Sequence, residues 1–141
     1  MKVLIPVDGS ECSNATLAWA AQTLDKATAE LHLFYVIPRG IPELVTEEYQ
    51  VEDAITVLHH AQATLKAAGC HVGSHEYAEG DPVQEICDYA DAIEADQVLM
   101  GSHGRSGLAR ILLGSVSSGV MEHCRRPVFI YKNVKPASSA K

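Results

Sequence analysis

Four glycines in one short stretch are the residues of this chain best suited to bind an anion. Gly101, Gly104, Gly107 and Gly114 follow a short apolar run and precede a helical pattern that begins near Ser115. Glycine has no Cβ to block close approach, and a helix N-terminus carries partial positive charge, so backbone N–H groups in such a loop can surround an anion. The stretch therefore predicts a phosphate-binding loop, although glycines that only form turns would give the same composition.

The spacing of these glycines excludes two common nucleotide-binding motifs. No Gly-Lys-Ser/Thr closes the stretch, as a Walker A element requires, and the glycines do not fit Gly-x-Gly-x-x-Gly. Phosphate charge would therefore have to be met by backbone amides, by Arg105 or Arg110, or by a divalent ion that enters with a nucleotide.

A second polar loop, Asp8-Gly9-Ser10, follows the first apolar run of the chain. Ligands of open parallel sheets bind beyond the carboxyl ends of the strands, where the strand order reverses. If the strands before the two loops are neighbours, the loops face each other, and Asp8 can accept a hydrogen bond from a base or a ribose. Helix capping by Asp8, and by Ser115 at the other loop, is an alternative reading that does not exclude ligand contact.

The elements that must position these loops alternate along the chain. Apolar runs without polar alternation predict buried strands, and apolar residues at helical spacing predict helices between them. We therefore expect strands at 3–7, 31–37, 97–100 and 128–131, and helices at 11–27, 51–68, 82–93 and 115–124. The more polar segment 71–77 is expected to form a strand near the sheet edge. Asp81, Pro82 and Gln84 fit a capping box, and Gly69 fits a C-cap. This alternation predicts an α/β protein with a parallel sheet and helices on both faces.

Length and composition bound the class of protein. With 141 residues, 47% of them hydrophobic and 21% charged, the chain fits one folded domain, which we place at residues 1–132 with a polar tail at 133–141. The net charge of −7 argues against affinity for nucleic acid or an anionic membrane. Because no apolar run has the length of a membrane span and the start lacks a signal-peptide pattern, we expect a cytoplasmic protein.

Cysteine and histidine residues give weaker signals. The cysteines are far apart with no Cys-x-x-Cys pair, so buried or incidental thiols are expected instead of a zinc site or a disulfide framework. His59-His60, and His71 with His75, lack a third ligand, and no metal site is predicted from them. His103 in the glycine stretch is a candidate base, but a solvated loop histidine is the simpler interpretation.

Three parts of the sequence together resemble one protein family. Gly101-Ser-His-Gly104, followed nine residues later by Gly114-Ser115, is similar to the Gly-x2-Gly-x9-Gly-Ser/Thr motif of the ATP-binding universal stress proteins. The opening Pro6-Val7-Asp8-Gly9-Ser10 and the run Gly80-Asp81-Pro82 also match that family. The resemblance covers nearly the whole chain, from Lys2 to Tyr131.

The resemblance implies a fold, a ligand and an assembly. The fold is an open, parallel, five-stranded sheet of order 3-2-1-4-5 with helices on both faces, Rossmann-like and of the adenine nucleotide alpha hydrolase-like group. ATP would bind where the first and fourth strands meet, with Mg or Mn bound through the phosphates, and a homodimer would form through the strand Val128–Tyr131. Carried over by position, Asp8 contacts adenosine and Val36 lines the adenine pocket. Met100 and Gly101 adjoin the ribose and phosphates, and the phosphates are held by Gly104, Gly114, Ser115 and Val116, with Ser117 close by. The full predicted set is Pro6, Val7, Asp8, Val36, Met100, Gly101, Gly104, Arg105, Gly114, Ser115, Val116 and Ser117.

The function expected from these features is an ATP-binding regulatory or stress-response module that acts on a protein partner the sequence does not name. No lysine on the phosphates, positioned base or arginine finger can be assigned, so fast phosphoryl transfer is not expected. A slow ATP hydrolase that uses Asp8 or His103 to activate water is one alternative. A nucleotide-free interaction module of the same fold is another.

Overall fold

Nine helices and strands alternate through the part of the chain that the computed structural model describes, residues 1–39, 47–104 and 113–133. The strands are β1 (Lys2–Pro6), β2 (Glu30–Pro38), β3 (His71–Gly80), β4 (Gln97–Gly101) and β5 (Val128–Tyr131). The helices are α1 (Glu11–Thr23), α2 (Glu47–Ala67), α3 (Pro82–Ala92) and α4 (Ser115–His123). Type and order agree with the sequence-based prediction, and most bounds differ by only a few residues.

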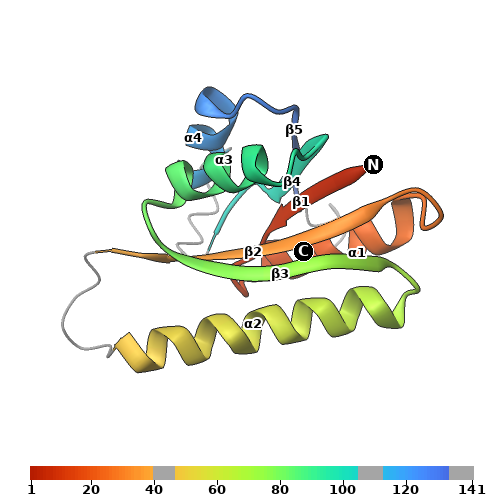
Figure 1. Cartoon of the computed structure of the whole chain (residues 1–141), viewed down its shortest axis with the longest axis horizontal. Coiled ribbons are helices and arrows are strands. Elements are labelled where there is room, and N and C mark those ends of the chain that lie inside the picture. Colours follow the sequence, from red (N-terminus) through yellow and green to blue (C-terminus); the bar gives the residue numbers. More distant parts are fainter. Residues whose placement is uncertain (40–46, 105–112, 134–141) are drawn as a thin grey trace, which may run out of the picture.

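The five strands form one parallel sheet in the order β3-β2-β1-β4-β5 (Figure 1). This is the predicted order, with the long strand β3 at one edge and β5 at the other. β1 pairs with β2 on one side and with β4 on the other. The loops that leave β1 and β4 therefore start side by side at the carboxyl edge of the sheet.

Helices cover both faces of the sheet and enclose two apolar cores. Leu31, Leu33 and the other odd-numbered residues of β2 pack with residues of α1 and α2. The alternate residue Phe34 packs on the opposite face with Ile86 of α3 and Val120 of α4. Figure 1 shows α2 on one side of the sheet and α3 with α4 on the other. Because β1 is buried on both faces, its Val3-Leu4-Ile5 run has no polar alternation.

The first helix is shorter than its apolar spacing predicts. We expected it to extend to residue 27, but α1 ends at Thr23, and Leu24 closes it by donating its N–H to the Ala20 carbonyl at 3.0 Å. The following turn is held by Asp25, whose Oδ1 accepts the Ala27 N–H at 2.9 Å and whose carbonyl accepts the Ala29 N–H at 2.8 Å. An aspartate that bonds its own neighbouring backbone ends a helix more strongly than one further apolar residue extends it.

The start of α3 is half of the predicted capping box. Asp81 Oδ2 accepts the N–H of Gln84 at 2.9 Å, and Pro82 occupies the first helical position, as expected. The Gln84 amide does not return to the Asp81 backbone, because it donates to Asp88 Oδ1 at 2.8 Å. Gly69, with φ of +86°, ends α2 as predicted.

No helix in the described ranges is long and apolar enough to span a membrane.

Candidate functional site

A cavity of about 350 Å³ lies at the carboxyl ends of β1 and β4, where the two predicted loops meet. All predicted site residues within the described ranges line it: Pro6, Val7, Asp8, Val36, Met100, Gly101, Gly104, Gly114, Ser115, Val116 and Ser117. Arg105, Arg110 and Gly107 lie outside the described residues, as does the loop from Gly40 to Thr46. The two arginines proposed for phosphate charge therefore have no described position.

The loop after β1 is held by its own side chains. Gly9 adopts φ of +79°, a left-handed conformation that favours glycine. Asp8 Oδ1 accepts the Ser10 N–H at 2.9 Å, and the Asp8 N–H donates to Ser13 Oγ at 3.3 Å. The alternative in which Asp8 caps the helix is wrong, because Ser10 is the N-cap and accepts the Ser13 N–H at 3.1 Å. Asp8 lies two residues before that cap, among the residues that line the cavity.

The loop after β4 is closed at its base by the carbonyl of Ser102. That oxygen accepts the Gly114 N–H at 2.6 Å and the Ser117 hydroxyl at 2.8 Å. The Ser102 N–H in turn donates to the Tyr131 carbonyl of β5 at 2.9 Å. Ser102 is only 1% exposed, so these bonds are shielded from water. The start of the loop is thereby tied to the start of α4.

Two glycines of the loop are needed for different reasons. A Cβ on Gly104 would stand 2.7 Å from Asp8 Oδ2, so this glycine lets the two loops approach each other across the cavity. A Cβ on Gly101 would stand 2.7 Å from Cys12 Sγ and 3.1 Å from Thr16 Oγ1. Gly101 lines the cavity, but its lack of a side chain is required by the packing of β4 against α1.

The N-terminus of α4 points its first turn at the cavity. Gly114 is the N-cap and supplies no side-chain hydrogen bond, so the alternative in which Ser115 caps this helix is wrong. The Ser117 hydroxyl donates inward, to the carbonyls of Ser102 and Gly114. The N–H groups of the first helical turn have no partner within the helix and carry the positive end of its dipole. A ligand with negative charge is favoured at this end of the cavity.

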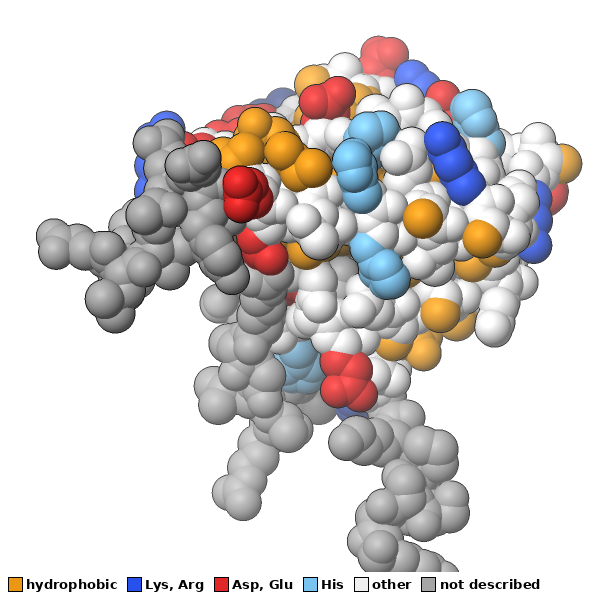
Figure 2. Space-filling model, turned by 90° about the horizontal axis from the view of Figure 1, so that it is seen from below, with side chains coloured by type: hydrophobic (Ala, Val, Ile, Leu, Met, Phe, Trp, Pro, Cys, Tyr) orange, Lys and Arg blue, Asp and Glu red, His pale blue; other side chains and the backbone are white. Residues whose placement is uncertain are grey.

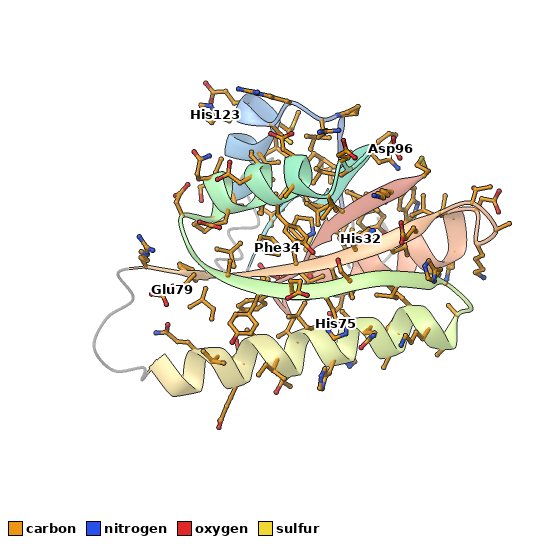
Figure 3. All side chains as sticks on the ribbon, in the orientation of Figure 1. His32, Phe34, His75, Glu79, Asp96 and His123 are labelled. Carbon is orange, nitrogen blue, oxygen red and sulfur yellow. The ribbon has the colours of Figure 1, made fainter. Side chains whose placement is uncertain are left out.

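The opposite side of the cavity is apolar and contains residues that the sequence reasoning missed. Phe34, Val36 and Ile86 line it, and Phe34 stacks on Tyr89 of α3 with ring centroids 4.3 Å apart and planes 6° apart. Figure 3 shows Phe34 between the sheet and α3. Phe34 is two positions before Val36 and therefore on the same face of β2, so strand alternation could have found it. Ser13, Tyr35, Pro38, Pro82 and His103 complete the lining.

His103 lines the cavity from the described part of the glycine loop. Its Nδ1 lies 2.9 Å from Ser102 Oγ, which orients the ring. Together with Asp8 it places a candidate base on each of the two loops.

Most histidines outside the cavity lie on the surface, whereas His32 is buried, with its Nδ1 2.7 Å from Ser74 Oγ. The face covered by α2 carries several of them (Figure 2), and the rings of His59 and His75 meet edge to face at 6.3 Å. In the described ranges, no three histidine, cysteine or acidic side chains come together in a way that could hold a metal ion.

The arrangement is suited to a ligand with a flat apolar part and a charged part. The wall that contains Phe34 can pack against the flat apolar part of the ligand. Asp8 can accept hydrogen bonds from hydroxyl or amino groups in the middle of the ligand. The glycine loop and the start of α4 can hold its anionic end. A parallel α/β protein with such a cavity, at the point where the strand order reverses, has the architecture of the Rossmann-like ligand-binding proteins.

Comparison with known proteins identifies the family. Residues 1–132 match the model of the universal stress protein family, and the chain belongs to this family. It is 32% identical to universal stress protein MJ0531 of Methanocaldococcus jannaschii over 143 aligned positions, which cover 95% of this chain and 83% of the relative.

Two solved structures are similar over almost their full length. The structure of MJ0577, also of Methanocaldococcus jannaschii, has a TM-score of 0.81 and 29% identity, with 96% of this chain and 97% of that chain covered. A universal stress protein in complex with cAMP has a TM-score of 0.72 and 26% identity, with 94% of this chain and 96% of that chain covered. The predicted fold and the membership of the universal stress protein family are thereby confirmed, whereas the ATP-binding branch stays a prediction.

Proposed function

We propose that this chain binds an adenine nucleotide in the cavity between the β1 and β4 loops, and that ATP with Mg or Mn is the form that it uses. The observation that carries the proposal is the convergence of Asp8, Gly104 and the start of α4 on one cavity at the switch point of the sheet. A relative 26% identical has been crystallised with cAMP, which supports the adenine nucleotide class.

The residues of the cavity fit such a ligand. A volume of about 350 Å³ is in the range of small-molecule sites, and the stacked pair of Phe34 and Tyr89 supports an apolar wall beside which a purine ring can pack. The chain carries a net charge of −7, so phosphates must be held by local groups. The glycine loop and the free N–H groups at the start of α4 supply them, and a divalent ion would neutralise the remaining charge.

The first experiment is to denature freshly purified protein and identify any released small molecule by mass spectrometry. Calorimetry with Mg-ATP, ADP and cAMP then ranks the nucleotides. Asp8→Ala should weaken binding, whereas Asp88→Ala, which removes the same group from the outer side of α3, should not. If the wild type releases no nucleotide on denaturation and binds none of the added nucleotides, the proposal is refuted and the nucleotide-free interaction module remains.

A slow ATP hydrolase is the second candidate function, and the orientation of His103 by Ser102 favours it. A steady-state phosphate-release assay separates the two. Release that falls in His103→Ala while nucleotide affinity is kept supports hydrolysis at this site. Binding without release supports a regulatory module whose nucleotide state controls a protein partner.

A homodimer through β5 is part of the proposal. β5 pairs with β4 on one side and, in the described ranges, with no strand on the other, and Phe129 on it is 55% exposed. An unpaired edge with an exposed aromatic ring is suited to pairing with a second copy. Phe129→Lys should give a folded monomer in analytical ultracentrifugation; an unchanged dimer would place the interface elsewhere.

A further inference from the structure

A chain of three polar side chains lies behind the apolar wall of the cavity. His32 Nδ1 is 2.7 Å from Ser74 Oγ, and Ser74 Oγ is 2.8 Å from the Tyr89 hydroxyl. The chain links β2, β3 and α3 and ends on the ring that stacks against Phe34. His32, Ser74 and Tyr89 are not among the residues that line the cavity, whereas Phe34 is. The chain can therefore act on a ligand through Phe34.

A register shift in the sheet brings the first two members of the chain together. Leu31 of β2 pairs with Val72 of β3. The next residue of β2, His32, pairs with Ser74, so Gly73 is an extra residue in β3. A Cβ on Gly73 would stand 2.7 Å from His32 Cε1, and a larger residue at this position would displace the imidazole ring. Such a bulge changes which side chain faces the partner strand, and here it places the Ser74 hydroxyl against His32.

The direction of the hydrogen bonds follows from the position of Glu30. His32 is 7% exposed, and its buried Nε2 faces Glu30 Oε2 at 3.4 Å. A carboxylate favours a proton on the nitrogen that faces it, so Nε2 carries the hydrogen and Nδ1 accepts. The Ser74 hydroxyl then donates to His32 Nδ1, and the Tyr89 hydroxyl donates to Ser74 Oγ. Because each hydroxyl of the chain has an acceptor, the network holds its members in one arrangement.

Phe34 lies between this chain and the cavity. It is two residues beyond His32, on the same face of β2, and only 3% of it is exposed. Figure 3 shows His32 and Phe34 along β2, on the side of the sheet that α3 covers. The hydrogen bond to Ser74 fixes the hydroxyl end of the Tyr89 ring, and the parallel stack transfers this constraint to the Phe34 ring.

We propose that His32, Ser74 and Tyr89 are positioning residues that fix the Phe34 ring for the base of a bound nucleotide. The inference rests on the proposed function for the identity of the ligand. A wall that is already ordered loses little side-chain freedom when a flat ring packs against it, and this raises affinity. The proposed phosphate end of the cavity is formed by the glycine loop and the start of α4 instead. The chain should therefore affect the affinity for the base and leave the affinity for the phosphates unchanged.

Two variants break the chain, and two serve as matched controls. Ser74→Ala removes the middle hydroxyl, and Tyr89→Phe removes the terminal hydroxyl but keeps the stacked ring. Ser74→Thr keeps a hydroxyl at the same position, in a strand, where β-branched residues are well tolerated. Tyr77→Phe also removes a hydroxyl from β3, but from a side chain that is 44% exposed. Urea denaturation establishes that each variant folds.

The first readout needs no nucleotide. Nuclear Overhauser effects between the Phe34 and Tyr89 rings measure the stack, and the nitrogen chemical shifts of His32 identify the ring nitrogen that carries the proton. We expect the effects between the rings to weaken in Ser74→Ala and to keep their wild-type strength in Ser74→Thr and Tyr77→Phe. Unchanged ring contacts in Ser74→Ala would overturn the proposal, as would a wild-type His32 with its proton on Nδ1 and none on Nε2.

The second readout separates the base from the phosphates. Calorimetry measures the affinity for Mg-ATP, and competition against ATP measures the affinity for Mg-tripolyphosphate, which has no base. Ser74→Ala and Tyr89→Phe should weaken ATP binding about three- to tenfold, the range expected for one lost hydrogen bond, and should leave tripolyphosphate binding unchanged. Equal losses for both ligands, or an unchanged ATP affinity in both variants, would contradict the positioning role. If the wild type binds no ATP, the proposed function fails, and the ring contacts measured without nucleotide still decide whether the chain fixes Phe34.

Discussion

Replacement of Gly119 by alanine tests the close contact between α3 and α4. Gly119 lies in the middle of a nine-residue helix, where glycine costs about 1 kcal/mol relative to alanine. The new methyl would stand 2.5 Å from Val83 Cγ2 and 3.3 Å from Val83 Cγ1. Val83 cannot turn away freely, because a β-branched side chain in a helix has one strongly preferred rotamer.

The expected effect is the sum of two opposing terms. Overpacking of this kind costs about 1–3 kcal/mol, and the gain in helix propensity offsets about 1 kcal/mol of it. Gly119→Ala should therefore lower the free energy of unfolding by about 0–2 kcal/mol. In a Val83→Ala background both valine methyls are absent, and the same substitution should raise the free energy of unfolding by up to about 1 kcal/mol. The sign of the effect depends on Val83.

Urea denaturation of the four proteins in this double-mutant cycle measures the coupling between the two positions. A coupling of about 1–3 kcal/mol supports the contact. If Gly119→Ala stabilises the protein equally in both backgrounds, the helices do not approach each other as described.

Three further predictions follow from single contacts. Gly104→Ala places a methyl group 2.7 Å from Asp8 Oδ2. It should reduce nucleotide affinity, measured by calorimetry, at least about tenfold and leave the urea midpoint nearly unchanged. Unchanged affinity would show that the two loops need not approach closely. The contact with His32, whose Nε2 lies 3.4 Å from Glu30 Oε2, holds the pKa of Glu30 below its ordinary value, and the charges of His32, His71 and Lys2 act in the same direction. A carboxyl group whose pKa is lower in the folded than in the unfolded state stabilises the protein at pH values above its unfolded-state pKa, and this stabilisation is lost as the pH falls through the folded-state pKa. Glu30→Gln should therefore lower the urea midpoint at pH 7 and should match the wild type near pH 3. A difference in midpoint that is the same at both pH values would contradict the assignment. Because burial raises the pKa of Cys87 to about 11, alkylation of Cys87 by iodoacetamide should accelerate about tenfold for each pH unit between 8 and 10, and a plateau near pH 9 would contradict the shift.

The sequence carries strong local signals for the elements and for the two loops. Unbroken apolar runs predicted four of the five strands, helical spacing predicted the helices, and the more polar segment 71–77 was predicted as an edge strand. The Gly-x2-Gly-x9-Gly-Ser spacing selected the loop that lines the cavity. The strand order came from the family resemblance, because the choice of neighbours in a parallel sheet is decided by long-range packing.

Choices between nearby hydrogen-bond partners were not predictable. Asp8 and Ser10 are both good N-cap residues, and only the backbone turn at Gly9 decides that Ser10 takes this role. The same holds for the Gln84 side chain, which could bond the Asp81 backbone, as in a capping box, or Asp88, as it does in the structure. Such alternatives differ by less than the free energy that tertiary packing contributes.

Contacts between elements distant in the sequence were also missed. The raised pKa of Cys87, to which burial and the neighbouring Cys124 contribute, depends on the packing of α3 against α4, which the sequence does not show. The role of Gly101 in packing against Cys12 has the same origin, since spacing within one loop carries no information about the helix behind it.

The position of β1 and β4 in the middle of the sheet has a consequence for hydrogen exchange. Each of these strands is bonded to a neighbour on both sides, so their amides at the floor of the cavity should exchange with deuterium only when the whole sheet opens. The described loop residues beyond these ladders, at 8–10 and 103–104, should exchange through local opening. A bound ligand should therefore slow exchange in the loops and at the start of α4. The exchange rates of the strand amides at the floor of the cavity should change only as much as the global stability of the protein changes.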